Sequence, residues 1–320
     1  SAAPGLPSCR RCRQCLVFGL LAFHMAWTAL AREKLVPANF QEHRDALGFE
    51  WDVQQHGTIG DGSNDCFDGA LTLSVNGANF QPQATQMTAS GIEYVLERKN
   101  LNGFVVTRRI LLDTKRSAVR YIESFHNPQS TPRQLQAQVS ATLGSSCAQT
   151  ITTSGQVFSG ALGKKDVGLM TISNTQRPCV LFLLGDHRSR HQPSVNIRSS
   201  RYYQFNYTLN VKPGRTATLV HLIAQRRGVT PASVAQIVKP LYHHRLVAPA
   251  IPRALRRTVV NFGVGGWTSL QPGAPLQPLL ALVENLGVER GEQDVLVTGE
   301  EGRLRGRLVS ESWHVKTRRG

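Results

Sequence analysis

Apolar and polar residues alternate along much of the chain between residues 70 and 225, with the two-residue period of β-strands. In residues 134–143 every second residue is apolar, so one face of this strand would be apolar and the other polar. The pairs Asn76-Gly77 and Asn102-Gly103 follow strand patterns and are typical of hairpin turns. The pattern predicts strands over residues 70–75, 92–99, 104–112, 118–126, 134–143, 167–173, 179–184, 202–211 and 216–225.

These strands are closely spaced, and no helical pattern intervenes before residue 230. This order favours a mainly β protein, a large antiparallel β-sandwich or supersandwich, over βαβ units. One or two helices are expected late in the chain. Thr230-Pro231 is typical of a helix start and predicts a helix to about Lys239, and a second helix is expected over 276–286. A small strand-rich segment should follow, with strands at 295–298, 304–309 and 313–317.

The N-terminal residues have the three parts of a secretory signal. Arg10, Arg11 and Arg13 form a basic start, residues 16–30 are apolar, and the small-residue pattern at 29–31 predicts cleavage. The apolar stretch is shorter than the roughly 20 residues that a membrane-spanning helix needs, although an uncleaved anchor remains the alternative. We therefore expect a periplasmic, secreted or cell-surface protein.

This organisation divides the chain into four parts. The expected parts are a signal peptide (1–31), an antiparallel β-sandwich (32–230), a helix with a Pro/Gly-rich connecting segment (231–292), and the start of a truncated small β domain (293–320). Outside the signal, three cysteines remain, Cys66, Cys147 and Cys179. An odd number allows at most one internal disulfide, and the sequence leaves the pairing open.

The charge is concentrated in one part of the chain. The protein has 37 Lys and Arg against 21 Asp and Glu, a net charge of +16, and residues 187–283 contain no acidic residue. Arg245, Arg253, Arg256 and Arg257 lie in this stretch and are candidates for an anionic partner, a cell-envelope polymer or a membrane surface contacted peripherally. Nucleic acid is not expected as the partner of an exported chain. The alternative is that these arginines only keep the segment soluble.

Residues 51–68 form the densest polar constellation, and function is often placed in such loops. Trp51, Asp52 and His56 are candidate ligand-binding residues, and an Asp–His pair can also serve acid–base chemistry. Within the segment 202–211, Tyr202 and Tyr203 are further candidates, because aromatic rings on a sandwich face can stack on sugar rings.

Asp61, Asp65 and Asp68 are candidate calcium ligands, because carboxylates spaced within a Gly-rich loop supply the oxygens that Ca²⁺ prefers. The segment is not an EF-hand: Cys66 stands where the EF-hand requires Gly, and Thr72 where it requires Glu. An ordered turn, in which the aspartates bond to their own backbone, is the alternative interpretation. Calcium is the only cofactor that the sequence suggests.

Several short segments together resemble a group of large exported bacterial β-sandwich proteins and, more distantly, mutarotase-type supersandwich domains. The resemblance spans about residues 45–225 and is carried by Val106-Thr107-Arg108-Arg109-Ile110, Arg120-Tyr121-Ile122-Glu123, Asn127-Pro128, Leu143-Gly144-Ser145-Ser146 and Val211-Lys212-Pro213-Gly214. It implies a periplasmic or surface protein in contact with carbohydrate. The catalytic His and Glu pair of the mutarotases is not recognised in the sequence.

No Gly-x-Ser-x-Gly elbow, phosphate-binding loop, His-Glu-x-x-His or dinucleotide fingerprint occurs in the chain. The first hypothesis is therefore an exported, non-catalytic β-sandwich that binds a glycan or another cell-envelope macromolecule. One alternative is a carbohydrate-active enzyme that uses residues 51–68. The other is an electrostatic binder of an anionic polymer or membrane surface through residues 187–283.

Overall fold

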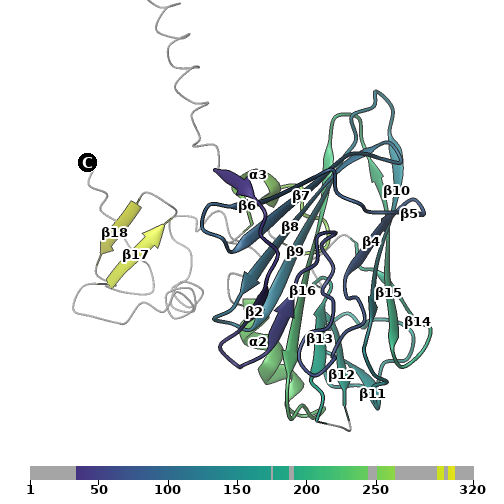
Figure 1. The fold of residues 1–320 in the computed structure, drawn as a ribbon, viewed down its shortest axis with the longest axis vertical. Helices are drawn as coiled ribbons and strands as arrows, with labels where there is room; N and C mark the ends of the chain where they lie inside the picture. The colour runs from purple at the N-terminus through teal and green to yellow at the C-terminus, as the bar shows by residue number, and fades with distance from the viewer. Residues whose placement is uncertain are drawn as a thin grey trace, which may run out of the picture.

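Two antiparallel sheets face each other in the computed structural model (Figure 1). The structure describes residues 34–173, 176–186, 191–243 and 251–263, together with the strands at 294–298 and 302–306. Within these residues the protein is mainly β, with two helices late in the chain, and the predicted fold class is confirmed. The predicted signal (1–31) and the predicted helix at 276–286 lie outside the described residues.

The larger sheet has nine strands. Their order is β1 (Leu35–Pro37), β6 (Ala84–Thr88), β7 (Glu93–Leu101), β8 (Phe104–Asp113), β9 (Ala118–His126), β16 (Thr216–Arg226), β13 (Cys179–Leu183), β12 (Gly168–Ile172) and β11 (Gln149–Thr152). The smaller sheet has five, in the order β14 (Ser194–Ile197), β15 (Tyr202–Val211), β10 (Arg133–Thr142), β4 (Thr72–Val75) and β5 (Ala78–Asn79).

The local signals of the sequence explain these elements. Asn76-Gly77 joins β4 to β5 and Asn102-Gly103 joins β7 to β8, and all four residues have φ between 48° and 86°. Both central residues of such two-residue turns need a positive φ, which Asn and Gly adopt at low cost. The predicted alternation in β10 is also confirmed, because Leu135, Ala137, Val139, Ala141 and Leu143 are all buried.

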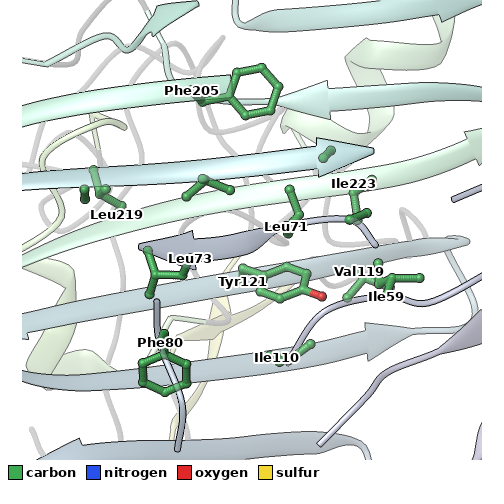
Figure 2. Packing of buried hydrophobic residues seen from close by; sticks show 14 of the residues in the cluster. Ile59, Leu71, Leu73, Phe80, Ile110, Val119, Tyr121, Phe205, Leu219 and Ile223 are labelled. Atoms are coloured by element: carbon green, nitrogen blue, oxygen red, sulfur yellow. The ribbon is translucent and has the colours of Figure 1, made fainter. Parts of the chain in front are cut away.

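The main core lies between the two sheets. Figure 2 shows Tyr121 and Leu219 of the large sheet packed with Leu73 and Phe205 of the small sheet. Because side chains of a strand alternate between faces, each strand contributes every second residue to this core.

Two of the places where the chain crosses from one sheet to the other are neighbours, the one between β9 and β10 and the one between β15 and β16. Buried Asn127 holds both crossings together. Its side-chain amide donates to the carbonyls of Thr131 at 2.8 Å and Val211 at 2.9 Å, and its backbone carbonyl accepts from Gly214 at 2.9 Å. The predicted tight turn at 212–215 is therefore present and connects strands of different sheets.

A second apolar cluster lies on the outer face of the large sheet, where helix α2 (Val234–His243) packs. The predicted helix start is capped reciprocally: Ser233 N donates to Thr230 Oγ1 at 3.3 Å, and Thr230 N donates to Ser233 Oγ at 2.9 Å. Helix α3 (Arg253–Arg256) follows, and Val259 then forms a parallel bridge with Thr218 of β16. The described part of the connecting segment thus packs on the sandwich.

Two small hairpins complete the described structure. β2 (Glu42–Arg44) pairs with β3 (Glu50–Asp52), and β17 (Asp294–Thr298) pairs with β18 (Gly302–Gly306). The last pair corresponds to the first two strands predicted for the C-terminal segment, and the strand predicted at 313–317 lies outside the described residues. Among the described helices, none is long and apolar enough to cross a membrane.

Candidate functional site

A hollow of about 400 Å³ opens where the β2–β3 hairpin begins and ends. Glu42, the first residue of β2, pairs directly with Asp52, the last residue of β3, so the register places two carboxylates at the rim. The lining consists of Phe40, Gln41, Glu42, Asp52, Val53, Gln54, Gln55 and His56. Asp52 and His56, two of the ligand-binding residues predicted from sequence, therefore line the same hollow.

One side of the hollow is an aromatic ring held in a fixed orientation. The Phe40 ring stacks on the buried Tyr94 ring with 4.9 Å between centroids and 5° between planes. The Tyr94 hydroxyl donates to the Asn39 carbonyl at 3.3 Å and lies 3.3 Å from His43 Nε2. Tyr94 covers one face of Phe40, and this half-buried ring also packs against the main core while lining the hollow.

The opposite side is a tight turn that exposes polar side chains. Gly57 N donates to the Gln54 carbonyl at 2.7 Å, and Gln54 N donates to the Thr58 carbonyl at 2.7 Å, which fixes the turn. Gln54, Gln55 and His56 are exposed on it. Each amide brings two N–H donors and one carbonyl acceptor.

His56 is held by a neighbour, and its surroundings favour the neutral imidazole. Its Nε2 lies 2.7 Å from Thr58 Oγ1. Partial burial of the ring, together with the positive charge of Arg108, lowers the pKa of His56 below its ordinary value of 6.5. The neutral imidazole has one nitrogen that donates and one that accepts a hydrogen bond.

The Asp52 carboxylate organises the loop. Its oxygens accept from the backbone N–H groups of Asp61 and Gly62 at 3.0 Å, and from Gln54 Nε2 at 3.1 Å. These bonds occupy the carboxylate as an acceptor and fix the positions of Asp52 and Gln54. The arrangement suits recognition of hydroxyl groups better than proton transfer by Asp52.

Trp51 lies in the core, with 1% of its surface exposed, and its Nε1 donates to Asp45 Oδ2 at 2.8 Å. Tyr203 is also fully buried, and its hydroxyl lies 2.8 Å from Thr150 Oγ1. Both rings are therefore inaccessible to a ligand at the surface, because their strand positions face inward. Tyr202 faces outward, half-buried, with the Arg198 guanidinium 5.7 Å from its ring centroid.

Two of the three candidate calcium ligands are paired with arginines. Asp65 forms an ion pair with Arg177 at 3.3 Å, and Asp68 pairs with Arg201. In the described part of the chain, no three His, Cys, Asp or Glu side chains gather closely enough to hold a metal ion. Calcium at Asp61, Asp65 and Asp68 stays a prediction from their spacing, without a ligand cluster in the structure.

The predicted anionic-partner arginines are only partly described. Arg245 and the side chain of Arg253 lie outside the described part. Arg256 is half-buried and donates through Nε to the Ile251 carbonyl at 3.0 Å, whereas Arg257 is exposed. Neither Arg256 nor Arg257 lines the hollow, and the role of all four arginines stays a prediction.

A buried ionic cluster between the sheets was missed by the sequence analysis. Arg108 Nη2 donates to Glu123 Oε1 at 3.0 Å, and Glu123 Oε2 lies 2.7 Å from His221 Nδ1. His221 Nε2 lies 3.0 Å from the hydroxyl of Tyr207, which donates to the Leu184 carbonyl at 2.9 Å. Solvent does not reach these side chains, all of which are at most 2% exposed.

A signal for this cluster is present in the sequence. Arg108, Glu123 and His221 each occupy an apolar position of an alternating strand, for example Arg108 between Val106 and Ile110. A charged residue at a core position must find a partner there. The pattern therefore indicates that all three residues are buried and need partners, although it does not indicate which of them contact each other.

Comparison with known proteins gives a distant likeness to solved structures. No family model and no curated protein matches the chain. A putative aldose 1-epimerase from Klebsiella pneumoniae is 7% identical over 60% of this chain and 80% of its own, with a TM-score of 0.40. A putative aldose 1-epimerase from Escherichia coli K12 is 8% identical over 60% of this chain and 99% of its own, with a TM-score of 0.38.

A heparan sulfate lyase mutant from Pedobacter heparinus is 11% identical over 60% of this chain and 36% of its own, with a TM-score of 0.39. Mutarotase-like proteins are thus among the solved structures that the chain is similar to, and the distant resemblance predicted from the sequence is confirmed. The identities are too low for the likeness to say what this chain does.

Proposed function

We propose that this protein binds a neutral carbohydrate in the hollow formed by residues 40–42 and 52–56. The observation that carries the proposal is the lining, which combines three glutamine amides, a neutral imidazole, carboxylates and one aromatic ring in a hollow of about 400 Å³. Pockets for small ligands commonly enclose about 300–1,000 Å³, so the space suits one or two sugar rings.

The polar groups match the chemistry of sugar hydroxyls. Each hydroxyl both donates and accepts a hydrogen bond, and an amide such as Gln54 or Gln55 does the same. The exposed Glu42 carboxylate adds an acceptor, and the Phe40 ring offers an apolar surface to the C–H face of a sugar.

Charge supports a neutral ligand over an anionic one at this site. Glu42 and Asp52 are paired across the hairpin, and each would repel a sulfate or carboxylate group of an anionic polymer. Arg44, the nearest arginine on the hairpin, is already paired with Glu50.

Binding is supported better than catalysis because the carboxylate best placed in the hollow is occupied. Asp52 accepts two backbone N–H groups that shape the loop, and it would have to release them to act as a base. Export, predicted from residues 1–31, would bring the hollow to the glycans of a cell envelope.

A glycan array tests the proposal with the full-length chain and two variants. The wild type should bind one or more neutral oligosaccharides, and the double variant Gln54→Ala, Gln55→Ala should lose binding by about tenfold or more, as expected for two lost hydrogen bonds. Gln129→Ala is the matched control, an exposed glutamine in a loop at 127–132, and it should bind as the wild type.

Both glutamines are exposed, so the double variant should have the same urea midpoint of unfolding as the wild type. Absence of any neutral glycan among the bound sugars would overturn the proposal. Equal binding by the wild type and a folded double variant would do the same, because the sugar would then lie elsewhere.

A further inference from the structure

Within β4, β10, β14 and β15, the outer face of the five-stranded sheet carries no charged side chain; at its edge Arg198, which follows β14, has its guanidinium 5.7 Å from the Tyr202 ring. Alternation along β4, β10, β14 and β15 sends every second residue outward, and all of these are amides, hydroxyls or one tyrosine. The outward residues are Thr72, Ser74, Gln134, Gln136, Gln138, Ser140, Thr142, Ser194, Asn196, Tyr202, Gln204, Asn206, Thr208 and Asn210.

This absence of charge is unusual for the protein and for protein surfaces. The whole chain has 58 charged residues, 37 basic and 21 acidic, and a net charge of +16. Soluble surfaces are commonly about 25–35% Lys, Arg, Glu and Asp, so four adjacent strands without one form a distinct surface. On these strands the one charged residue is Arg133, whose guanidinium lies 5.9 Å from the Phe104 ring, on the inward side.

The face is exposed at one end and ordered at the other, where Gln204 is buried. Gln134, Gln136, Thr208 and Asn210 are exposed at one end of the paired strands β10 and β15. At the other end the side chains bond to each other in sequence: Asn196 Nδ2 donates to Gln204 Oε1 at 3.2 Å, and Gln204 Nε2 donates to the Tyr202 hydroxyl at 3.2 Å. Such bonds hold the amides in fixed positions.

Because strand geometry is regular, the outward side chains of β10 and its neighbouring strands lie at regular spacings in two directions. Gln134, Gln136 and Gln138 are two residues apart and so repeat at about 6.7 Å along β10, while neighbouring strands add rows about 4.8 Å apart. The register gives each its partner on β15: Gln134 faces Asn210, Gln136 faces Thr208, and Gln138 faces Asn206.

The chemistry of the face selects one class of partner. Nucleic acids and anionic membranes need several Lys or Arg side chains. The strands of the face direct none outward, and Arg198 lies at the edge against the Tyr202 ring. Stable protein interfaces have an apolar and aromatic centre, whereas this face has Tyr202 alone at one edge. Repeated hydroxyl groups without charge are the remaining match for repeated amides and hydroxyls.

We propose that the outer face of the five-stranded sheet is a second carbohydrate site, a platform for an extended, neutral polysaccharide chain. It is separate from the hollow at residues 40–42 and 52–56 and shares no residue with it. The proposal rests on the face itself and holds whether or not the hollow binds a soluble sugar.

Sedimentation with insoluble neutral polysaccharides tests the platform. The full-length protein is mixed with cellulose, chitin and β-1,3-glucan, and the protein left in solution is measured at 50 and 500 mM NaCl. The wild type should sediment with at least one of them, to the same extent at both salt concentrations, because no charge on the face takes part.

Variants locate the binding. The triple variant Gln134→Ala, Gln136→Ala, Thr208→Ala removes three exposed side chains and should lower the sedimentation affinity by about tenfold or more. Gln86→Ala and Gln129→Ala, both exposed but outside the face, are the matched controls and should sediment as the wild type.

Three results overturn the platform. The first two are sedimentation with none of the three polysaccharides, and full sedimentation by a triple variant whose urea midpoint equals that of the wild type. Sedimentation lost at 500 mM NaCl also overturns it, because binding would then come from the basic residues. The hollow is decided separately by the glycan array, so failure of one proposal is distinguishable from failure of the other.

Discussion

The side chain of Asn261 binds the backbone of Val220 as a neighbouring strand would. Asn261 Nδ2 donates to the Val220 carbonyl at 2.7 Å, and Oδ1 accepts from the Val220 N–H at 2.9 Å. The same Nδ2 donates to the Leu184 carbonyl at 2.7 Å, just after β13. Asn261 thereby fills the place where β13 no longer pairs with β16, since that pairing stops at Leu222.

Replacing this buried amide should be costly. Asn261→Ala removes the partner of the Val220 N–H and of the Val220 carbonyl in a place that water does not reach, and leaves the Leu184 carbonyl with the Tyr207 hydroxyl. We expect the free energy of unfolding to fall by about 3 kcal/mol, measured by urea denaturation. Asn210→Ala, an exposed asparagine on β15, is the control and should change stability by less than about 0.5 kcal/mol. A small effect at Asn261 would mean that the segment 258–262 does not hold the sheet.

The buried pair of Arg108 and Glu123 should be coupled. Arg108→Met removes the partner of a carboxylate that is 0% exposed, and should cost about 3–5 kcal/mol. The double variant Arg108→Met, Glu123→Leu removes both charges and should be less destabilised than the sum of the single variants. Urea denaturation of the wild type, the two single variants and the double variant gives the coupling energy between Arg108 and Glu123. Additive losses of stability would contradict the contact between the two side chains.

The carboxyl group of Glu123 should make the stability of the fold depend on pH. Burial alone would raise the pKa of Glu123, but the His221 imidazole and the Arg108 guanidinium outweigh it and hold the pKa below its ordinary value of 4.5. The ionised carboxylate therefore stabilises the fold above pH 4.5, and this contribution is lost as the pH falls through the lower pKa of the folded state.

We expect the stability difference between the wild type and Glu123→Gln to be constant from pH 7 to about pH 5, and to shrink below pH 4.5. Urea midpoints at each pH measure it. Glu97→Gln, a half-exposed carboxyl on β7, is the control, and its difference should stay small throughout. A difference for Glu123→Gln that grows as the pH falls would contradict the lowered pKa.

The cysteines should differ in reactivity. Cys66, Cys147 and Cys179 are free thiols in the structure, so the single disulfide that the cysteine count allows is not formed there. Burial raises the pKa of Cys66 to about 12 and also raises that of Cys179. At pH 8 hardly any Cys66 is thiolate, the form that reacts with iodoacetamide.

Cys147 is half-buried and should be alkylated first, followed by the other two only in urea. Peptide mass spectrometry of the native protein, alkylated at pH 8, checks this order and separates these residues from the N-terminal cysteines. Rapid native alkylation of Cys66 would contradict its burial.

The sequence predicted the strands well because local rules determine them. The alternation in β10 and the Asn-Gly turns at 76–77 and 102–103 depend only on neighbouring residues, and the structure confirms them. It could not predict which strands pair across long separations. The hydrogen bond between Gln225 Nε2 and the Glu50 carbonyl, at 2.7 Å, joins residues 175 positions apart, and no local pattern indicates it.

The candidate site was predicted in part for the same reason. Asp52 and His56 lie in one polar loop, which marks the loop but not the hairpin partner Glu42 or the ring of Phe40. Trp51 and Tyr203 look like binding residues by type, yet strand alternation sends both inward. Alternation also explains the uncharged outer face, because the polar residues between the apolar ones in 134–142 all fall on it.

The most direct test of the proposed function is an NMR titration of the full-length protein that follows the side-chain amide signals of Gln54 and Gln55. Cellotetraose, chitotetraose and maltotetraose are added in turn, with the Gln129 amide as the internal control. Binding in the hollow predicts saturable shifts of the Gln54 and Gln55 signals with at least one of these sugars, while the Gln129 signal stays in place. Unchanged Gln54 and Gln55 signals at saturating concentrations of all three sugars would contradict it.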